Sequence, residues 1–89
     1  MKSSIKRPKQ HFPLVEVWWS DASDMEAGWA TDLEKPKHAM ALSVGFLLMD
    51  DKDHLVIALD TDEHGAHNGR SQIPRGMVKK IKVLRKADK

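Results

Sequence analysis

Residues 41–60, ALSVGFLLMDDKDHLVIALD, decide the fold that this sequence predicts. Two apolar runs rich in Val, Ile and Leu flank the polar segment 50–53, which is the composition of two antiparallel strands joined by a short loop. Because side chains alternate along a strand, the first run presents two faces. We assign one of them to the core, namely Leu42, Val44, Phe46 and Leu48. The other face holds Ala41, Ser43, Gly45, Leu47 and Met49.

Both faces of this hairpin are largely apolar, and one hairpin cannot cover them alone. We therefore expect the second face to form a subunit interface, which makes the protein a homo-oligomer. Gly45 also has an expected role, because strong bending of a strand favours a glycine where another backbone approaches.

The length of 89 residues predicts a single domain, because so short a chain cannot divide its core further. We expect residues 1–11 to be a flexible basic arm, residues 12–85 the domain and residues 86–89 a basic tail. The chain has no cysteine, which excludes a disulfide framework and suits a reducing cytoplasm. No run has the apolar core of a secretory signal or the roughly 20 residues that span a bilayer, so a soluble protein without a membrane partner is expected.

The net charge of +2 hides an uneven distribution. Residues 1–9 carry four basic side chains and no acid, and residues 70–89 carry eight basic side chains against Asp88 alone. Residues 10–69 carry the other twelve acids against three lysines. Such polarity can create an anion-binding surface, or it can let the termini pair with acidic loops of the same or a neighbouring subunit.

The first predicted strand is residues 14–20, LVEVWWS. Its odd-numbered apolar residues alternate with Glu16 and Ser20, so Val15, Val17 and Trp19 are expected in the core. Trp18 lies on the polar face and should stay partly exposed. It either packs under a loop or offers a stacking platform for a base or ring.

Residues 22–40 form a long connection, which includes a short helical turn that Pro36 ends. Connections of this length in a compact domain cover a barrel end or build a site. Trp29 is its most prominent residue, and it either lines a site or plugs the open end of a small barrel.

Residues 61–69, TDEHGAHNG, must turn the chain, because Gly65 and Gly69 supply the positive φ that turns need. The acids and histidines here offer metal ligands, but their spacing matches no established site, so we predict no metal or cofactor. The chain also lacks a nucleophile elbow, an H-E-x-x-H motif and a phosphate loop. We therefore expect a protein that is not an enzyme.

The final segment, GRSQIPRGMVKKIKVL, predicts two more strands. The fourth should stop at Pro74, which cannot donate to a ladder, and one 3₁₀ turn should precede a fifth strand over residues 80–84. We expect Ile81, Val83 or Leu84 to reach the core. Five strands with a helical turn before the last are the layout of an SH3-like or Sm-like barrel, so the expected fold class is all-β.

The segments VEVWWSDASDMEAGWATDLEK, ALSVGFLLMDDKDHLVIALD and NGRSQIPRGMVKKIKVL resemble small single-domain proteins encoded by bacteriophages and prophages. The resemblance spans roughly residues 14–84 and carries no established catalytic residue. It implies an accessory protein in the cytoplasm of an infected bacterium that acts by binding.

Three functions are compatible with these features. The first is an oligomeric sponge that sequesters a nucleotide-derived immune signal, with aromatic stacking and guanidinium groups as its chemistry. The second is a nucleic-acid-binding small barrel, based on the basic termini and exposed aromatics. The third is a protein interaction module that inhibits a host protein or serves in virion assembly. The candidate ligand-binding residues are Trp18, Trp29, Asn68, Arg70 and Arg75.

Overall fold

The computed structural model describes residues 5–20 and 40–89. They form five strands, which are β1 (Leu14–Ser20), β2 (Met40–Asp50), β3 (His54–Thr61), β4 (His67–Pro74) and β5 (Val78–Arg85), and a 3₁₀ helix, η2 (Arg75–Met77), between the last two. The predicted mainly β class, the central hairpin and the short helical turn are confirmed. None of the helices in these two ranges is long and apolar enough to cross a membrane.

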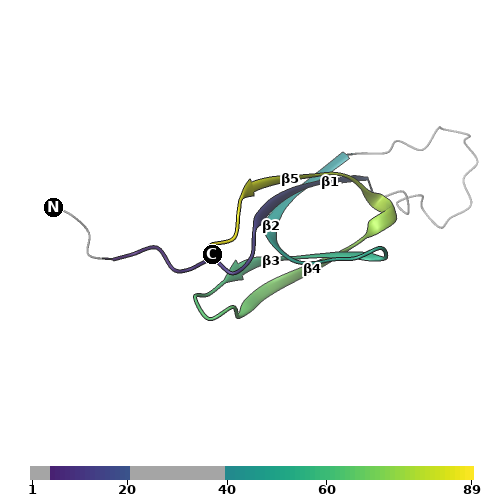
Figure 1. Ribbon diagram of the computed structural model, residues 1–89. Helices are drawn as coiled ribbons and strands as arrows, with labels where there is room; N and C mark the ends of the chain where they lie inside the picture. The colour runs from purple at the N-terminus through teal and green to yellow at the C-terminus, as the bar shows by residue number, and fades with distance from the viewer. Residues whose placement is uncertain (1–4, 21–39) are drawn as a thin grey trace, which may run out of the picture.

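All five strands are antiparallel and belong to one sheet with the order β4-β3-β2-β1-β5. The sheet is strongly bent: β1 and β5 lie on one side, β3 and β4 lie on the other, and β2 connects the two sides (Figure 1). The edge strands β4 and β5 are not hydrogen-bonded neighbours, so the sheet does not close on itself. The structure is therefore an open five-stranded sheet, and the closed barrel that the sequence predicted is not confirmed.

The core lies on the concave side of this bent sheet. Val15 and Val17 of β1 are fully buried with Leu55, and Ile57 and Ile73 complete the buried cluster. Trp19, Leu47, Met77, Val78 and Ile81 pack against it. The prediction that the odd-numbered residues of β1 face the core is confirmed. In β5, Ile81 is the one of the three expected residues that packs on the core, whereas Val83 and Leu84 are exposed.

The predicted faces of β2 are wrong, because the pairing with β1 reverses them. Ser43 lies opposite Val17 and Gly45 lies opposite Val15, and residues directly opposite each other share a face of the sheet. The small residues of β2 therefore face the core. Leu42 and Val44, which the sequence assigned to the core, are 61% and 46% exposed.

The bend explains why the smaller face of β2 turns inward. Gly45 is buried, and a Cβ atom on it would lie 2.9 Å from the carbonyl oxygen of Ala58 and 3.1 Å from Cβ of Ile57. A larger side chain has no room on the inside of so tight a curve. The close backbone approach expected at Gly45 is therefore present, but on the concave side.

Because the two faces of β2 are reversed, the subunit interface expected on this strand is also wrong. Most of the face assigned to it, including Ser43, Gly45 and Leu47, faces the interior of the chain. Met49 is exposed as expected, because a register shift between Leu47 and Met49 changes the face that the strand presents. The homo-oligomer itself stays a prediction.

Candidate nucleic-acid interface

The convex surface of β5, β1 and β2 carries the most exposed tryptophan or phenylalanine side chain among the described residues. Val17 and Trp19 point into the core, so Trp18 between them points outward, and its side chain is 38% exposed. Leu42 of β2 and Lys80 of β5 lie directly opposite it on the neighbouring strands. We call this surface the outer face. It consists of Glu16, Trp18, Leu42, Val44, Lys80 and Lys82.

Two contacts hold the indole of Trp18 in place. The Nζ atom of Lys80 lies 4.7 Å from the ring centroid, which is a cation–π contact. The indole Nε1–H donates a hydrogen bond to Oε1 of Glu16. The ring is therefore oriented on the sheet surface.

The charge of the outer face is positive on its β5 side. Lys82 lies opposite Glu16 in the register, but the Glu16 carboxylate accepts the indole hydrogen bond, and no ion pair joins it to Lys82 among the described residues. Lys80 and Lys82 are two residues apart on one strand, so their ammonium groups share a face. An aromatic ring with two lysines beside it can stack a base and attract a phosphate backbone.

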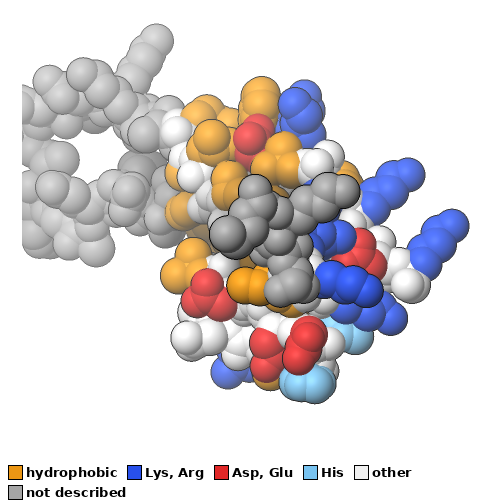
Figure 2. Space-filling model, turned by 90° about the vertical axis from the view of Figure 1, so that its left-hand side faces the viewer, with side chains coloured by type: hydrophobic (Ala, Val, Ile, Leu, Met, Phe, Trp, Pro, Cys, Tyr) orange, Lys and Arg blue, Asp and Glu red, His pale blue; other side chains and the backbone are white. Residues whose placement is uncertain are grey.

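The basic arm and the basic tail lie side by side. The backbone N–H of Asp88 donates to the carbonyl oxygen of Gln10 at 2.8 Å, and Nη2 of Arg7 lies 2.8 Å from Oδ1 of Asp88. Viewed from this end of the molecule, Lys and Arg side chains gather on one side (Figure 2). The two basic segments that the sequence places at opposite ends therefore add their charges on one part of the surface.

One acid in each of the two described hairpin turns is hydrogen-bonded to the backbone. Asp51 accepts hydrogen bonds from the N–H groups of Asp53 and His54, and the His54 bond is the main cause that lowers the pKa of Asp51. Asp62 accepts from Ala66 and His64, and the Ala66 bond lowers its pKa most. The expected pairing of basic ends with acidic loops is limited, among the described residues, to Arg75 Nε and Asp50 Oδ1 at 3.3 Å.

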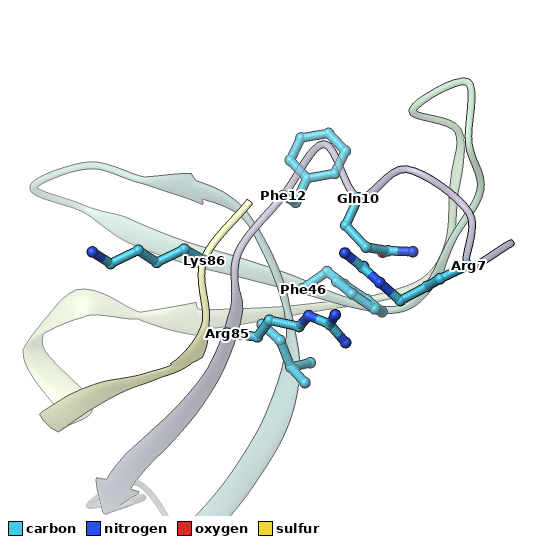
Figure 3. A pocket seen from close by; sticks show the side chains of 7 residues that line it. Arg7, Gln10, Phe12, Phe46, Arg85 and Lys86 are labelled. Atoms are coloured by element: carbon cyan, nitrogen blue, oxygen red, sulfur yellow. The ribbon is translucent and has the colours of Figure 1, made fainter. Parts of the chain in front are cut away.

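A small pocket lies where the arm meets the tail. We call it the terminal pocket, and it has a volume of about 150 Å³. Its walls are the side chains of Arg7, Gln10, Phe12, Leu14, Phe46, Arg85 and Lys86 (Figure 3). Three of these side chains are cationic and two are aromatic rings. The pocket therefore combines positive charge with flat apolar walls, a combination that suits an anionic ligand with a ring.

The sequence predicted only some of the residues of the outer face and none of the terminal pocket as a group. The alternation of Lys80, Ile81 and Lys82 is a signal that could have placed the two lysines on the outer face, because Ile81 is apolar. No comparable signal exists for Phe12, Phe46 and Arg85 of the terminal pocket, which come from three separate parts of the chain.

The predicted ligand-binding residues do not meet in one chain. Trp18 lies on β1, whereas Asn68 and Arg70 lie on the edge strand β4 with β2 and β3 between them. Arg75, in η2, pairs with Asp50 at the end of β2, and Trp29 lies outside the described residues.

Asn68 and Arg70 line different hollows on their side of the sheet. Asn68 lies beside Asp60 and Asp62 in one, and Arg70 lies beside Met49 and Val56 in the other. Within residues 5–20 and 40–89, no group of three His, Cys, Asp or Glu side chains is placed to hold a metal ion.

Comparison with protein-family models, with curated proteins and with solved structures finds no match for this chain. The functional argument therefore rests on the outer face and the terminal pocket.

Proposed function

We propose that the protein binds single-stranded nucleic acid on its outer face and catalyses no reaction. The single observation that carries this proposal is the indole of Trp18, exposed on a sheet surface with Lys80 above its ring and Lys82 beside it. Every nucleobase has a π-face that can stack on an indole, and lysines neutralise phosphates without reading sequence. Binding of this kind tolerates many sequences.

The fold supports the same proposal. The strand order β4-β3-β2-β1-β5 with a 3₁₀ turn before β5 is the arrangement expected of an SH3-like or Sm-like small barrel, and we propose that the open sheet belongs to this type. Its convex surface presents side chains to solvent along three strands, which suits a flexible single strand. The setting we propose is the cytoplasm of an infected bacterium, as the sequence resemblance implies.

A fluorescence anisotropy titration with a short labelled single-stranded oligonucleotide tests the proposal at low salt. Trp18→Ala should weaken binding by about 1–3 kcal/mol, because one base loses its stacking platform, and Trp18→Phe should retain part of the affinity. Lys82→Ala should weaken binding and should reduce the slope of log K against log salt by about 1.

Lys52→Ala is the matched control for Lys82→Ala. Lys52 is an exposed lysine in the turn between β2 and β3, and its removal changes the net charge by the same amount. The affinity of Lys52→Ala for the oligonucleotide should equal that of the unchanged protein. Equal losses in the two lysine variants, or no binding at low salt, would show that the outer face is not the interface.

The small nucleotide-derived ligand is the second candidate function. Its predicted residues on β1, β4 and η2 lie apart in one chain, so a site that uses them would have to form between subunits. The terminal pocket supports this ligand class better, because it brings cations and rings together within a single chain.

A further inference from the structure

The arm and the tail are joined at Asp88, through its backbone N–H and its carboxylate. Nη2 of Arg7 donates to Oδ1 at 2.8 Å and to Oδ2 at 3.0 Å, and the backbone N–H of Gln10 donates to Oδ2 at 2.8 Å. A guanidinium and a backbone N–H form the donor set that proteins use for phosphate oxygens as well as for carboxylates. The Asp88 carboxylate therefore occupies a position that is chemically suited to an oxyanion.

The electrostatics of this position favour negative charge. The Gln10 N–H bond and the Arg7 hydrogen bond lower the pKa of Asp88, and the nearby charge of Arg85 acts in the same direction. Asp88 carries the only acidic side chain in residues 5–13 and 85–89, where Lys6, Arg7, Lys9, Arg85, Lys86 and Lys89 supply the positive charge. A second anion that displaced Asp88 would meet the same cations.

The terminal pocket lies beside this oxyanion position and shares Arg7 and Gln10 with it. Its volume of about 150 Å³ matches that of a cavity which accommodates one six-membered aromatic ring. Phe12 and Phe46 supply apolar walls, and Figure 3 shows the side chains of Arg7 and Arg85 around Phe46. A ring in the pocket would place an attached phosphate within reach of the donors that now hold Asp88.

We propose that the terminal pocket binds an organic phosphate that carries one aromatic ring, and that Asp88 is an internal competitor for the phosphate position. A pyrimidine nucleotide has this chemistry, either free or as the 5′-phosphorylated end of a strand. The site does not rest on the proposed function of the outer face, because none of its lining residues is among the six that define that face.

The Asp88 contact then sets the affinity of the site. A ligand binds only in the fraction of molecules in which the carboxylate has left Arg7 and Gln10, so the apparent dissociation constant equals the intrinsic constant divided by that fraction. An exposed ion pair of this kind reduces the affinity by a factor of up to about five. Removing the charge at residue 88 should therefore strengthen binding rather than weaken it.

Isothermal titration calorimetry with uridine 5′-monophosphate tests this inference on the full chain. Asp88→Asn should bind the nucleotide more tightly than the unchanged protein, by up to about five-fold, because the amide keeps the shape and loses the charge. Arg7→Ala should lose most of the binding, whereas uridine without phosphate should not bind.

Arg75→Ala is the control for Arg7→Ala, because both guanidinium groups pair with an aspartate at the surface and only Arg7 lines the pocket. The affinity of Arg75→Ala for uridine 5′-monophosphate should equal that of the unchanged protein. The inference is overturned if Asp88→Asn binds no more tightly than the unchanged protein, or if the two arginine variants behave alike.

A comparison of free uridine 5′-monophosphate with oligonucleotides that have or lack a 5′-phosphate identifies the source of the ligand. If the protein prefers the oligonucleotide with a 5′-phosphate, the pocket binds the end of a strand. If it binds only the free nucleotide, the pocket binds a small ligand. Either result supports the site. Binding of neither phosphate overturns it. Trp18→Ala separates the two proposals, because it should weaken strand binding on the outer face and leave binding of the free nucleotide intact.

Discussion

Replacing Gly45 with alanine should destabilise the fold by pressing on the bend of the sheet. The new Cβ would lie 2.9 Å from the carbonyl oxygen of Ala58, 3.1 Å from Cβ of Ile57 and 3.2 Å from its Cδ1. The first of these atoms belongs to the backbone of β3, so the clash cannot be relieved by a change of rotamer. β2 and β3 must separate, or the bend must open.

Two opposing contributions set the magnitude. Forcing a methyl group into a well-packed region costs about 1–3 kcal/mol. An alanine also restricts the unfolded chain, and this effect stabilises the folded state by about 0.4–1 kcal/mol wherever the native conformation accepts it. Gly45 has no positive φ, so the second contribution applies and the net loss is about 0–2.6 kcal/mol.

Gly76→Ala isolates the clash because it shares only the favourable contribution. Gly76 lies in η2, also without a positive φ, and a Cβ atom there would meet nothing within 4 Å. The difference in unfolding free energy between the two variants should therefore equal the packing cost, about 1–3 kcal/mol. With an m-value of about 1 kcal/mol/M, their urea midpoints should differ by about 1–3 M.

The measurement is a urea titration of the three proteins followed by far-ultraviolet circular dichroism. Of the three proteins, Gly76→Ala should unfold at the highest urea concentration and Gly45→Ala at the lowest. Their m-values should be similar. Midpoints of the two variants within about 0.5 M of each other would refute the reasoning, because they would show that the backbone of β3 does not approach Gly45 closely.

Two further predictions concern the assignment of faces and the carboxylate at the terminal pocket. In the same urea titration, Leu55→Ala should lower the free energy of unfolding by about 2–5 kcal/mol and Leu42→Ala by less than about 0.5 kcal/mol. The reason is that Leu55 is fully buried and Leu42 faces solvent. Similar losses in the two variants would contradict the reversed faces of β2. The Gln10 N–H and Arg7 depress the pKa of Asp88 in the folded state, so its contribution to stability is present above its ordinary pKa of about 3.9 and is lost as the pH falls through the depressed value. The melting temperature of Asp88→Asn should therefore fall less in acid than that of the unchanged protein, and parallel acid profiles would show that this carboxylate does not stabilise the fold.

Much of the secondary structure follows from local pattern. The alternation of β1 predicts its buried valines and the exposure of Trp18, and the structure confirms both. Pro74 predicts the end of β4 and the 3₁₀ turn after it. Positive φ is present at Gly65 and Gly69, as predicted, although Gly69 lies within β4. These features depend on residues that are near one another in the chain, so the sequence contains the necessary information.

The functional surfaces could be predicted only in part. Trp18 was recognised as a stacking candidate, but its lysine partner comes from β5, and the pairing of β1 with β5 joins residues more than sixty positions apart. The terminal pocket was not predicted, because Phe12, Phe46 and Arg85 meet only when the arm and tail lie together. Arg70 and Arg75 were grouped with Trp18 by chemistry alone, and the sheet separates them.

The sequence by itself determined that residues 41–60 form a two-faced β-hairpin within a mainly β domain, because side-chain alternation and turn residues act locally. Only the tertiary structure decided which face is inside. Hydrophobicity favoured the face with Leu42 and Val44, but the bend brings the backbone of β3 against Gly45 and leaves space there only for small side chains. Room on the concave side of a curved sheet is a property of three strands together, and no single strand encodes it.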